Sequence, residues 1–305
     1  MSKFKREDFN IQNLGFARYP SPLQPLREEA NANFVCDDRH RVLFDHSFER
    51  VSLALESGSE PITIERSGPR EKIFFDPQKT RAAVVTCGGL CPGLNDVIRG
   101  LVMTLNYSYG VKTIYGIPYG YEGFIDAYGH TIVNLTPESV NEIHTEGGSL
   151  LGTSRGPQPI AQIVDKLLSL DVSILFVIGG DGTLRGASEI AREVSRRGIK
   201  ISVVGIPKTI DNDLEYMDKS FGFETAFAEA VRVIRCAHNE ATGHARGVGL
   251  VKVMGRDSGF IAAFAALADN CVNFVLIPEA ATHLEGPNGL LAHLEKRLTT
   301  RGHAV

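Results

Sequence analysis

Short apolar runs, rich in Val and Ile, recur from Arg81 onward, and a Gly or a Pro follows each of them closely. They do not alternate with polar residues, so each predicts a β-strand that is buried on both faces of a sheet. The six runs are residues 82–86, 111–117, 173–178, 201–206, 248–254 and 272–277.

Between these runs, apolar residues recur at helical spacing. Residues 160–168, 184–194 and 227–234 carry apolar side chains three and four positions apart, and Gly198 is placed to stop the second helix. Strands that alternate with helices predict parallel sheets joined by right-handed crossovers. In such folds the ligand binds at the carboxyl ends of the strands, which is where the Gly- and Asp-rich segments fall here.

Residues 1–80 have a different pattern, with prolines at 20, 22, 25, 61 and 69 among others and a polar Ser-Gly-Ser at 57–59. Val51, Leu53 and Leu55 alternate with small residues, which predicts one strand. We favour an arm that packs on the main body. The alternative is a regulatory or oligomer-contacting extension.

The last segment predicts a helix followed by the start of a strand. Leu290, Leu291, Leu294 and Leu298 form an apolar stripe, and Gly302 is placed to end the helix. Residues 303–305 then resemble the first residues of a further buried strand. We therefore expect that the chain lacks the end of a second domain.

Length and composition narrow the class of protein. The 305 residues favour two domains, and 43% hydrophobic with 22% charged residues is typical of a globular protein. The net charge of −4 gives no argument for a nucleic-acid partner. Five cysteines without a framework of spacings predict reduced thiols, and zinc at Cys87 and Cys91 is not expected. The longest apolar stretch, 260–268, is too short to span a bilayer, so we predict a cytoplasmic protein without a membrane partner.

Residues 84–95 form the first segment with candidate chemistry. A buried strand runs into Gly88-Gly89, and a helix follows that Asn95 is predicted to cap. Adjacent glycines let backbone N–H groups approach a phosphate, and a helix start favours anions. The alternative is an ordinary tight turn between strand and helix.

Residues 176–184 form the second segment, in which three glycines surround Asp181 at a strand end. Mg²⁺ prefers one or two carboxylates together with phosphate oxygens, so Asp181 is a candidate metal ligand. Thr183 could donate to a phosphate at the helix start. The alternative is Asp181 as a helix cap.

Residues 205–213, with the core PKTIDND, form the third segment. Asp211 and Asp213 crowd with Lys208, Thr209 and Asn212 just past a buried strand. Like charges repel, so a fold that holds them together is expected to use them, and a carboxylate that takes a proton from an alcohol fits. An Asx-rich turn is the alternative.

Residues 252–260 form the fourth segment, in which a strand ends at Met-Gly-Arg and a helix follows. The Arg256 guanidinium can clamp a phosphate through paired hydrogen bonds. The alternative is a structural Arg–Asp pair with Asp257.

In this order, each after a strand, the four segments resemble the phosphofructokinases, over residues 81 to 305. PKTIDND and MGR are the specific motifs, and GGDGT and CGGLCPGLN support them. The extended start is similar to the longer ATP-dependent branch of plants, protists and some bacteria. The resemblance implies an α/β fold of two Rossmann-like parallel-sheet domains, the second cut short. It divides the chain into an N-terminal extension (1–80), an ATP- and Mg-binding domain (81–215) and part of a sugar-phosphate-binding domain (216–305).

The resemblance also implies ATP-dependent phosphorylation of fructose 6-phosphate to fructose 1,6-bisphosphate in glycolysis, by an allosteric kinase that forms a homodimer or homotetramer. Asp211, Thr209 and Arg256 would form the catalytic group, with Asp211 as general base, and Asp181 would hold Mg²⁺. The residues implied for ATP are Gly89, Arg155, Gly156, Gly180, Asp181, Gly182 and Thr183. The residues implied for the sugar phosphate are Thr209, Ile210, Asp211, Met254, Gly255 and Arg256.

The phosphoryl donor depends on two positions. Relatives that use pyrophosphate carry Asp where this chain has Gly182, which favours ATP here. Lys208 is the contrary feature, since short bacterial ATP enzymes usually have Gly there. The longer ATP-dependent branch combines this Gly with this Lys, so we favour ATP and keep pyrophosphate as an alternative.

Two departures from the family pattern matter. Short bacterial enzymes have an Arg nine residues before the final Arg of MGR, and that position here is Gly247, with Arg246 one residue away. The family's remaining sugar-phosphate ligands would lie beyond Val305. A truncated, catalytically impaired nucleotide-binding isoform or fragment is therefore the alternative from another functional class.

Overall fold

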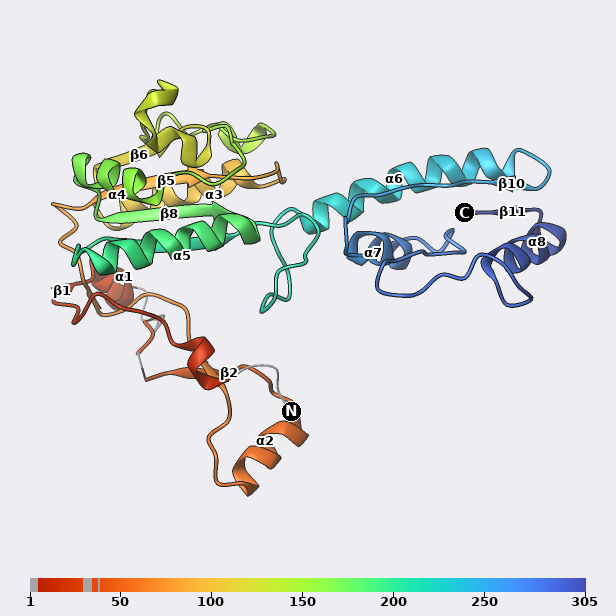
Figure 1. The fold of residues 1–305 in the computed structure, drawn as a ribbon, viewed down its shortest axis with the longest axis horizontal. Coiled ribbons are helices and arrows are strands. Elements are labelled where there is room, and N and C mark those ends of the chain that lie inside the picture. The colour runs from red at the N-terminus through yellow and green to blue at the C-terminus, as the bar shows by residue number, and fades with distance from the viewer. Residues whose placement is uncertain (1–4, 30–34, 38) are drawn as a thin grey trace.

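The computed structural model describes residues 5–29, 35–37 and 39–305. Figure 1 shows a sheet domain in the middle of the chain, a C-terminal part that α6 connects to it, and an N-terminal arm beside the sheet domain. Within these described residues, no helix is long and apolar enough to cross a membrane.

The sheet domain is built on five strands in the order β7-β6-β5-β8-β9. β5 (Arg81–Thr86), β6 (Thr113–Ile117), β8 (Ile174–Gly179) and β9 (Ser202–Pro207) are parallel, and β7 (Val133–Asn134) is antiparallel to β6. The first four predicted strands are therefore confirmed. β9 is an edge strand whose middle is exposed, so its expected burial on both faces is wrong.

Helices cover both faces of the sheet. On one face lie α3 (Leu94–Met103) and the π-turn η2 (Thr104–Ser108), packed on Ala82 and Val84 of β5. On the other lie α4 (Ile160–Ser169), α5 (Asp181–Arg196) and the short helix η3 (Gly120–Phe124), packed on Ala83 and Val85. Consecutive residues of β5 thus face opposite cores, which explains its apolar sequence without polar alternation. Two further single turns are η4 (Asp126–Tyr128) and η5 (Ile143–Thr145).

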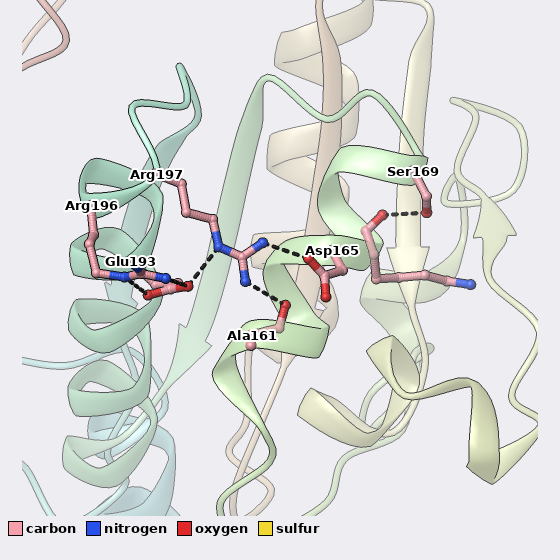
Figure 2. A network of polar contacts seen from close by, with 7 residues as sticks. Ala161, Asp165, Ser169, Glu193, Arg196 and Arg197 are labelled. Carbon is pink, nitrogen blue, oxygen red and sulfur yellow. Dashed lines mark hydrogen bonds and ion pairs between the residues drawn. The ribbon is translucent and has the colours of Figure 1, made fainter.

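An ion-pair network joins the two predicted helices on that second face, as Figure 2 shows. From the end of α5, Arg197 pairs with Glu193 at 2.6 Å and with Asp165 of α4 at 2.5 Å. Hydrogen bonds from Arg196 and Arg197 lower the pKa of Glu193 to about 2. The network fixes α4 against α5, whose first turn reaches the carboxyl end of β8.

The strand order places a crevice at the carboxyl ends of β5 and β8. From β5 the chain passes to β6 on one side, and it later returns to β8 on the other side. The turns that follow β5 and β8 therefore leave the sheet in opposite directions, which opens a binding crevice between them.

The C-terminal part contains α6 (Phe223–Thr242), α7 (Phe260–Ala268) and α8 (Leu290–Arg301). The helices predicted at 227–234 and 290–298 are confirmed, and Gly302 ends α8 with φ at +79°. β11 (His303–Ala304) pairs in parallel with β10 (Gly247–Val248), so the strand start predicted at 303 is also confirmed.

Two other strands predicted for the C-terminal part are wrong. Of the strand predicted at 248–254, only Val248 lies in a strand, at the end of β10, and the described residues 272–277 form no strand. A strand is stabilised by hydrogen bonds to a neighbouring strand, and these segments have such bonds only at one end. Gly249 N–H donates to the Ala304 carbonyl, and Asn273 and Phe274 N–H donate to that of Val305.

Gly247 occupies the position at which short bacterial enzymes have an Arg. A Cβ at Gly247 would lie 2.1 Å from the Ala241 carbonyl oxygen, so close packing against α6 excludes an Arg there.

The N-terminal arm consists of η1 (Arg6–Phe9), α1 (Gln24–Glu29), α2 (Phe48–Glu56) and two short antiparallel pairs. β1 (Tyr19–Pro20) pairs with β4 (Lys72–Ile73), and β2 (Arg41–Leu43) with β3 (Thr63–Glu65). The strand predicted at 51–55 is wrong, because it lies within α2. Leu, Ala and Glu in this run favour a helix, and no neighbouring strand pairs with it in the described part of the arm.

Candidate functional site

The glycine-rich turn after β5 is held by backbone hydrogen bonds. Cys87 N–H donates to the Ile178 carbonyl of β8, and Gly88 N–H donates to that of Ser154. Gly88 has φ at +85°, and a Cβ there would lie 3.9 Å from both Thr183 Oγ1 and Lys208 Nζ. Gly88 therefore brings the turns after β5, β8 and β9 together, although the residues that the resemblance implied for ATP include only its neighbour Gly89.

Helix α3 starts differently from the prediction. Its N-cap residue is Gly93, with φ at +91°, so the predicted cap at Asn95 is wrong. Asn95 lies inside the helix and is buried. Its amide donates to the Glu146 carbonyl at 3.0 Å and accepts from Leu150 N–H at 2.7 Å. It thereby fixes a loop beside the crevice.

Residues 153–156 close one wall of the crevice. Thr153 Oγ1 donates to the Gly88 carbonyl at 2.6 Å. A Cβ on Gly89 would lie 3.4 Å from the Arg155 guanidinium, so these two predicted residues meet. Gly156, with φ at +105°, has open space where its side chain would be.

The turn after β8 presents a helix N-terminus to the crevice. Gly180 is the N-cap residue of α5, and Asp181 is the first helical residue, so the alternative of Asp181 as the cap is wrong. The Asp181 carboxylate is largely exposed and pairs with Arg185 one turn later. Gly182 has no atom within 4 Å of the place of a Cβ. Tyr121 of η3 donates to the Thr183 carbonyl at 2.7 Å and holds this first turn from behind.

Lys208 lies buried under the two glycine turns. Its N–H donates to the Gly179 carbonyl at 2.9 Å, and its side chain extends to Gly88. Burial lowers the pKa of Lys208, and the nearby Arg155 charge lowers it further. Burial also raises the pKa of the neighbouring thiols, to about 12 for Cys87 and about 11 for Cys91. Among the described side chains, no carboxylate forms an ion pair with the Lys208 ammonium. This ammonium is therefore available to an anionic ligand in the crevice.

Asp211 carries an unused acceptor. Its Oδ1 is buried and has no hydrogen-bond partner among the described residues. Burial raises the pKa of Asp211 and the Asp213 charge adds to this, whereas the Arg256 and Lys208 charges oppose it. Thr209 Oγ1 donates to Asp213 at 2.5 Å and accepts from Asp211 N–H at 3.2 Å, which orders the segment. An unpaired carboxylate oxygen of raised pKa has the properties of a general base.

The fourth predicted segment reaches Asp211 from the C-terminal part. Ser258 Oγ donates to the Asp211 carbonyl at 3.0 Å. Gly255 has φ at +150°, and a Cβ there would lie 2.1 Å from the Ser258 carbonyl oxygen, so only Gly fits this turn. Arg256 is exposed and forms no ion pair with Asp257 within the described chain, so the structural-pair alternative is not supported.

Not every predicted residue points into the crevice. Ile210 is partly buried and packs against the apolar core that contains α3. Met254 is 64% exposed. Four residues of the site were assigned no ligand by the prediction: Gly88 and Lys208, which it named only within their segments, and Tyr121 and Ser258. The adjacent glycines and the charged Lys-Thr pair were signals for the first two, whereas Tyr121 and Ser258 are found only through their long-range bonds.

The donor set around Asp181 suits a metal ion that arrives with a phosphate chain. In the described residues no three His, Cys, Asp or Glu side chains gather into a protein cage. A single exposed carboxylate beside a helix N-terminus instead matches the preference of Mg²⁺ for one or two carboxylates plus phosphate oxygens.

Comparisons with known proteins agree with this geometry. The family model described as Phosphofructokinase matches residues 81–305. An ATP-dependent 6-phosphofructokinase of Borreliella burgdorferi is 47% identical over 302 residues, covering 98% of this chain and 66% of the relative. The chloroplastic ATP-dependent 6-phosphofructokinase 5 of Arabidopsis thaliana is 54% identical over 242 residues, covering 79% of this chain and 45% of the relative. The chain thus spans about half to two thirds of the length of these relatives.

Solved structures give the same fold. Phosphofructokinase from Saccharomyces cerevisiae matches with a TM-score of 0.63 and 28% identity, over 73% of this chain and 32% of that one. A pyrophosphate-dependent phosphofructokinase from Marinobacter aquaeolei matches with a TM-score of 0.65 over 74% of this chain and 59% of that one, and at 20% identity it supports the fold alone. With the family model, the close relatives and the α/β fold in agreement, the chain belongs to the phosphofructokinase family.

Proposed function

We propose that this chain carries out ATP-dependent phosphorylation of D-fructose 6-phosphate to fructose 1,6-bisphosphate, the first committed use of this sugar phosphate in glycolysis. The observation that carries the proposal is the bare, buried Oδ1 of Asp211, which lies among Lys208, Arg256 and the turns after β5 and β8. A buried acceptor without a partner is costly unless a ligand uses it.

The nucleotide phosphates would lie on Gly88, Gly89 and the first turn of α5, with Lys208 beneath them and Arg155 beside them. Asp181 would hold Mg²⁺, which neutralises phosphate charge when bound. Asp211 would take the proton of the sugar 1-hydroxyl as this oxygen attacks the γ-phosphorus, while the bond from that phosphorus to the β–γ bridging oxygen breaks and ADP leaves. Such a base contributes about 10²–10⁴-fold to the rate, and positioning of the phosphates supplies much of the rest.

The sugar phosphate would lie on the other side of Asp211, against Thr209, Gly255 and Arg256. Arg256 supplies the charge for its phosphate, while Met254 and the backbone at Ile210 border the site. This divides the chain at about residue 215 into an ATP half and a sugar-phosphate half, with residues 1–80 as an extension.

ATP is the proposed donor. Gly182 leaves space beside the phosphate turn, which an Asp would fill with a repelling charge. Relatives at 45–54% identity are named ATP-dependent, which supports the same choice. A pyrophosphate-dependent enzyme remains the second candidate, since Lys208 is also typical of that branch.

A homodimer or homotetramer in the cytoplasm completes the proposal. One of the plant relatives is named as chloroplastic. A nucleotide-binding form with impaired turnover is the second functional class, because the chain matches only part of its relatives' length.

One assay tests the proposal: formation of fructose 1,6-bisphosphate from fructose 6-phosphate, with ATP or with pyrophosphate as the only donor. The proposal expects turnover with ATP and little with pyrophosphate. Turnover with pyrophosphate alone would support the second donor. Binding of Mg·ATP without turnover would support the impaired form.

A further inference from the structure

The N-terminal arm contacts the loop that follows Asp211. Phe9 at the end of η1, Phe44 just after β2 and Tyr216 form an aromatic trio. Their ring centroids lie 4.5 Å apart for Phe9–Phe44, 5.4 Å for Phe9–Tyr216 and 5.6 Å for Phe44–Tyr216. These distances are typical of attractive aromatic pairs. In Figure 1 the loop between β9 and α6 descends on the side where the arm lies.

The loop that carries Tyr216 needs such support. Residues 213–219 contain no helix or strand, and Tyr216 has φ at +69°. A bulky residue rarely adopts this left-handed conformation, and it persists only where the surroundings hold it. Two rings of the arm provide that hold from outside the loop.

Both ends of the loop are fastened to the catalytic segment. The Asn212 side chain accepts from Ser220 N–H at 2.7 Å and donates to the Asp218 carbonyl at 3.1 Å. Ser220 Oγ in turn donates to the Thr209 carbonyl, and Thr209 Oγ1 accepts from Asp211 N–H. These bonds tie Asp218 and Ser220, which follow Tyr216 closely in the chain, to Asn212 and Thr209 on either side of Asp211. The backbone between Tyr216 and Asp218 thus links the ring to the catalytic segment.

We propose that the aromatic trio is a positioning device, by which the N-terminal arm holds the 212–220 loop and thereby sets the position of the Asp211 carboxylate. Its effect on catalysis rests on the proposed function. Its effect on the loop does not, and can be measured without turnover. Phe9, Phe44 and Tyr216 are thus positioning residues, assigned to an arm for which the family motifs give no role.

Amide hydrogen exchange of the chain 1–305 tests the structural half of the proposal. Phe44→Ala is expected to speed exchange of residues 212–220 by about three- to tenfold, with β5 and β8 unchanged. Phe48→Ala is the matched control, because Phe48 lies on the same arm, is 80% exposed and is not part of the trio. Unchanged exchange at 212–220 in Phe44→Ala, or an equal increase in Phe48→Ala, would overturn the proposal.

Substitutions of Tyr216 provide the second test, and they leave the arm intact. Tyr216→Gly removes the ring and tolerates the positive φ, but glycine also frees the backbone. Its faster loop exchange therefore supports the proposal only together with that of Phe44→Ala, which leaves the loop backbone unchanged. Tyr216→Phe keeps the ring and should retain wild-type exchange. If Tyr216→Gly exchanges like the wild type, the ring does not hold the loop.

Turnover gives the catalytic readout. In protein that is active with ATP and fructose 6-phosphate, Tyr216→Gly should lower kcat about three- to tenfold and leave KM for ATP unchanged, with Tyr216→Phe restoring kcat. Faster exchange with unchanged kcat would overturn the link to Asp211. Wild-type protein without turnover would contradict the proposed function alone, because the exchange result would still decide whether the arm holds the loop.

Discussion

The same alternation of apolar runs and helices produces two different results in two regions of this chain. In residues 81–207 it forms a sheet in which β5 has a parallel partner on each side, and all four predicted strands are present. In residues 216–305 the helices are present, but the only strand pair is two residues long. The helices of both regions close their own hydrogen bonds, whereas a strand depends on a neighbour.

Because of this difference, the two regions contribute to the candidate site in different ways. The sheet domain provides rigid strand ends, at which Gly88, Gly180 and Lys208 are tied to one another by backbone bonds and close approach. The C-terminal part contributes through the turn 255–258, which is tied to Asp211 by one serine hydroxyl. We therefore expect nucleotide binding to depend on the first region and sugar-phosphate binding on the second.

The largest effect should come from Asp211→Asn, at the junction of the two regions. The amide keeps the size of the side chain but cannot take a proton, so kcat in the active protein should fall at least about 10²-fold. Binding of Mg·ATP should be nearly unchanged, because the phosphate turns are intact. A variant that keeps more than about a tenth of the wild-type kcat would show that Asp211 is not the base.

Gly182→Asp should act on the nucleotide half alone. The protein has open space at this position, so the variant should fold normally. The new carboxylate would repel the phosphates by about 1–4 kcal/mol, equivalent to roughly five- to 1000-fold weaker ATP binding. Gly100→Asp in α3 is the control, since its side chain also meets no atom within 4 Å. Unchanged affinity for ATP in Gly182→Asp would remove Gly182 from the nucleotide site.

A smaller effect is expected on stability and its pH dependence. The pKa of Asp211 is raised above its ordinary value of 3.8, mainly by burial. The folded state is therefore destabilised as the pH rises above 3.8, and the full effect is reached above the raised pKa. Asp211→Asn should therefore raise Tm at pH 7, and the difference should shrink as the pH falls towards 3.8. Thermal unfolding of both proteins at several pH values measures this. A lower Tm of the variant at pH 7 would mean that the charge is stabilised in the fold.

The smallest effect should come from the ion pairs between α4 and α5. Arg197→Ala removes the contacts with Glu193 and Asp165, which lie at the C-terminal end of α5, whereas the N-terminal end of this helix lies at the crevice. Tm should fall by less than about 4 °C, and Mg·ATP binding should not change. A loss of ATP affinity would instead show that the orientation of α5 depends on this network.

Much of the sheet domain could be predicted from local sequence, because its strands and helices have strong periods and each strand has a partner. The Gly-rich turns and PKTIDND could also be located, because each directly follows a strand that the sequence predicts. The details of capping could not: Gly93 takes the position expected for Asn95, and Asn95 serves a loop some fifty residues away. Contacts such as Ser258 to Asp211, and Phe44 to Tyr216, depend on how distant segments meet, which no local pattern reveals.

The central claim is that the strand ends of the sheet domain form a site for Mg·ATP. Calorimetric titration of the chain 1–305 with ATP and with pyrophosphate, each with Mg²⁺ and with Mg²⁺ removed by a chelator, tests it most directly. We expect one saturable site that prefers Mg·ATP, and Asp181→Asn should weaken binding only when Mg²⁺ is present. Absence of saturable ATP binding, or tighter binding of pyrophosphate than of ATP, would contradict the claim.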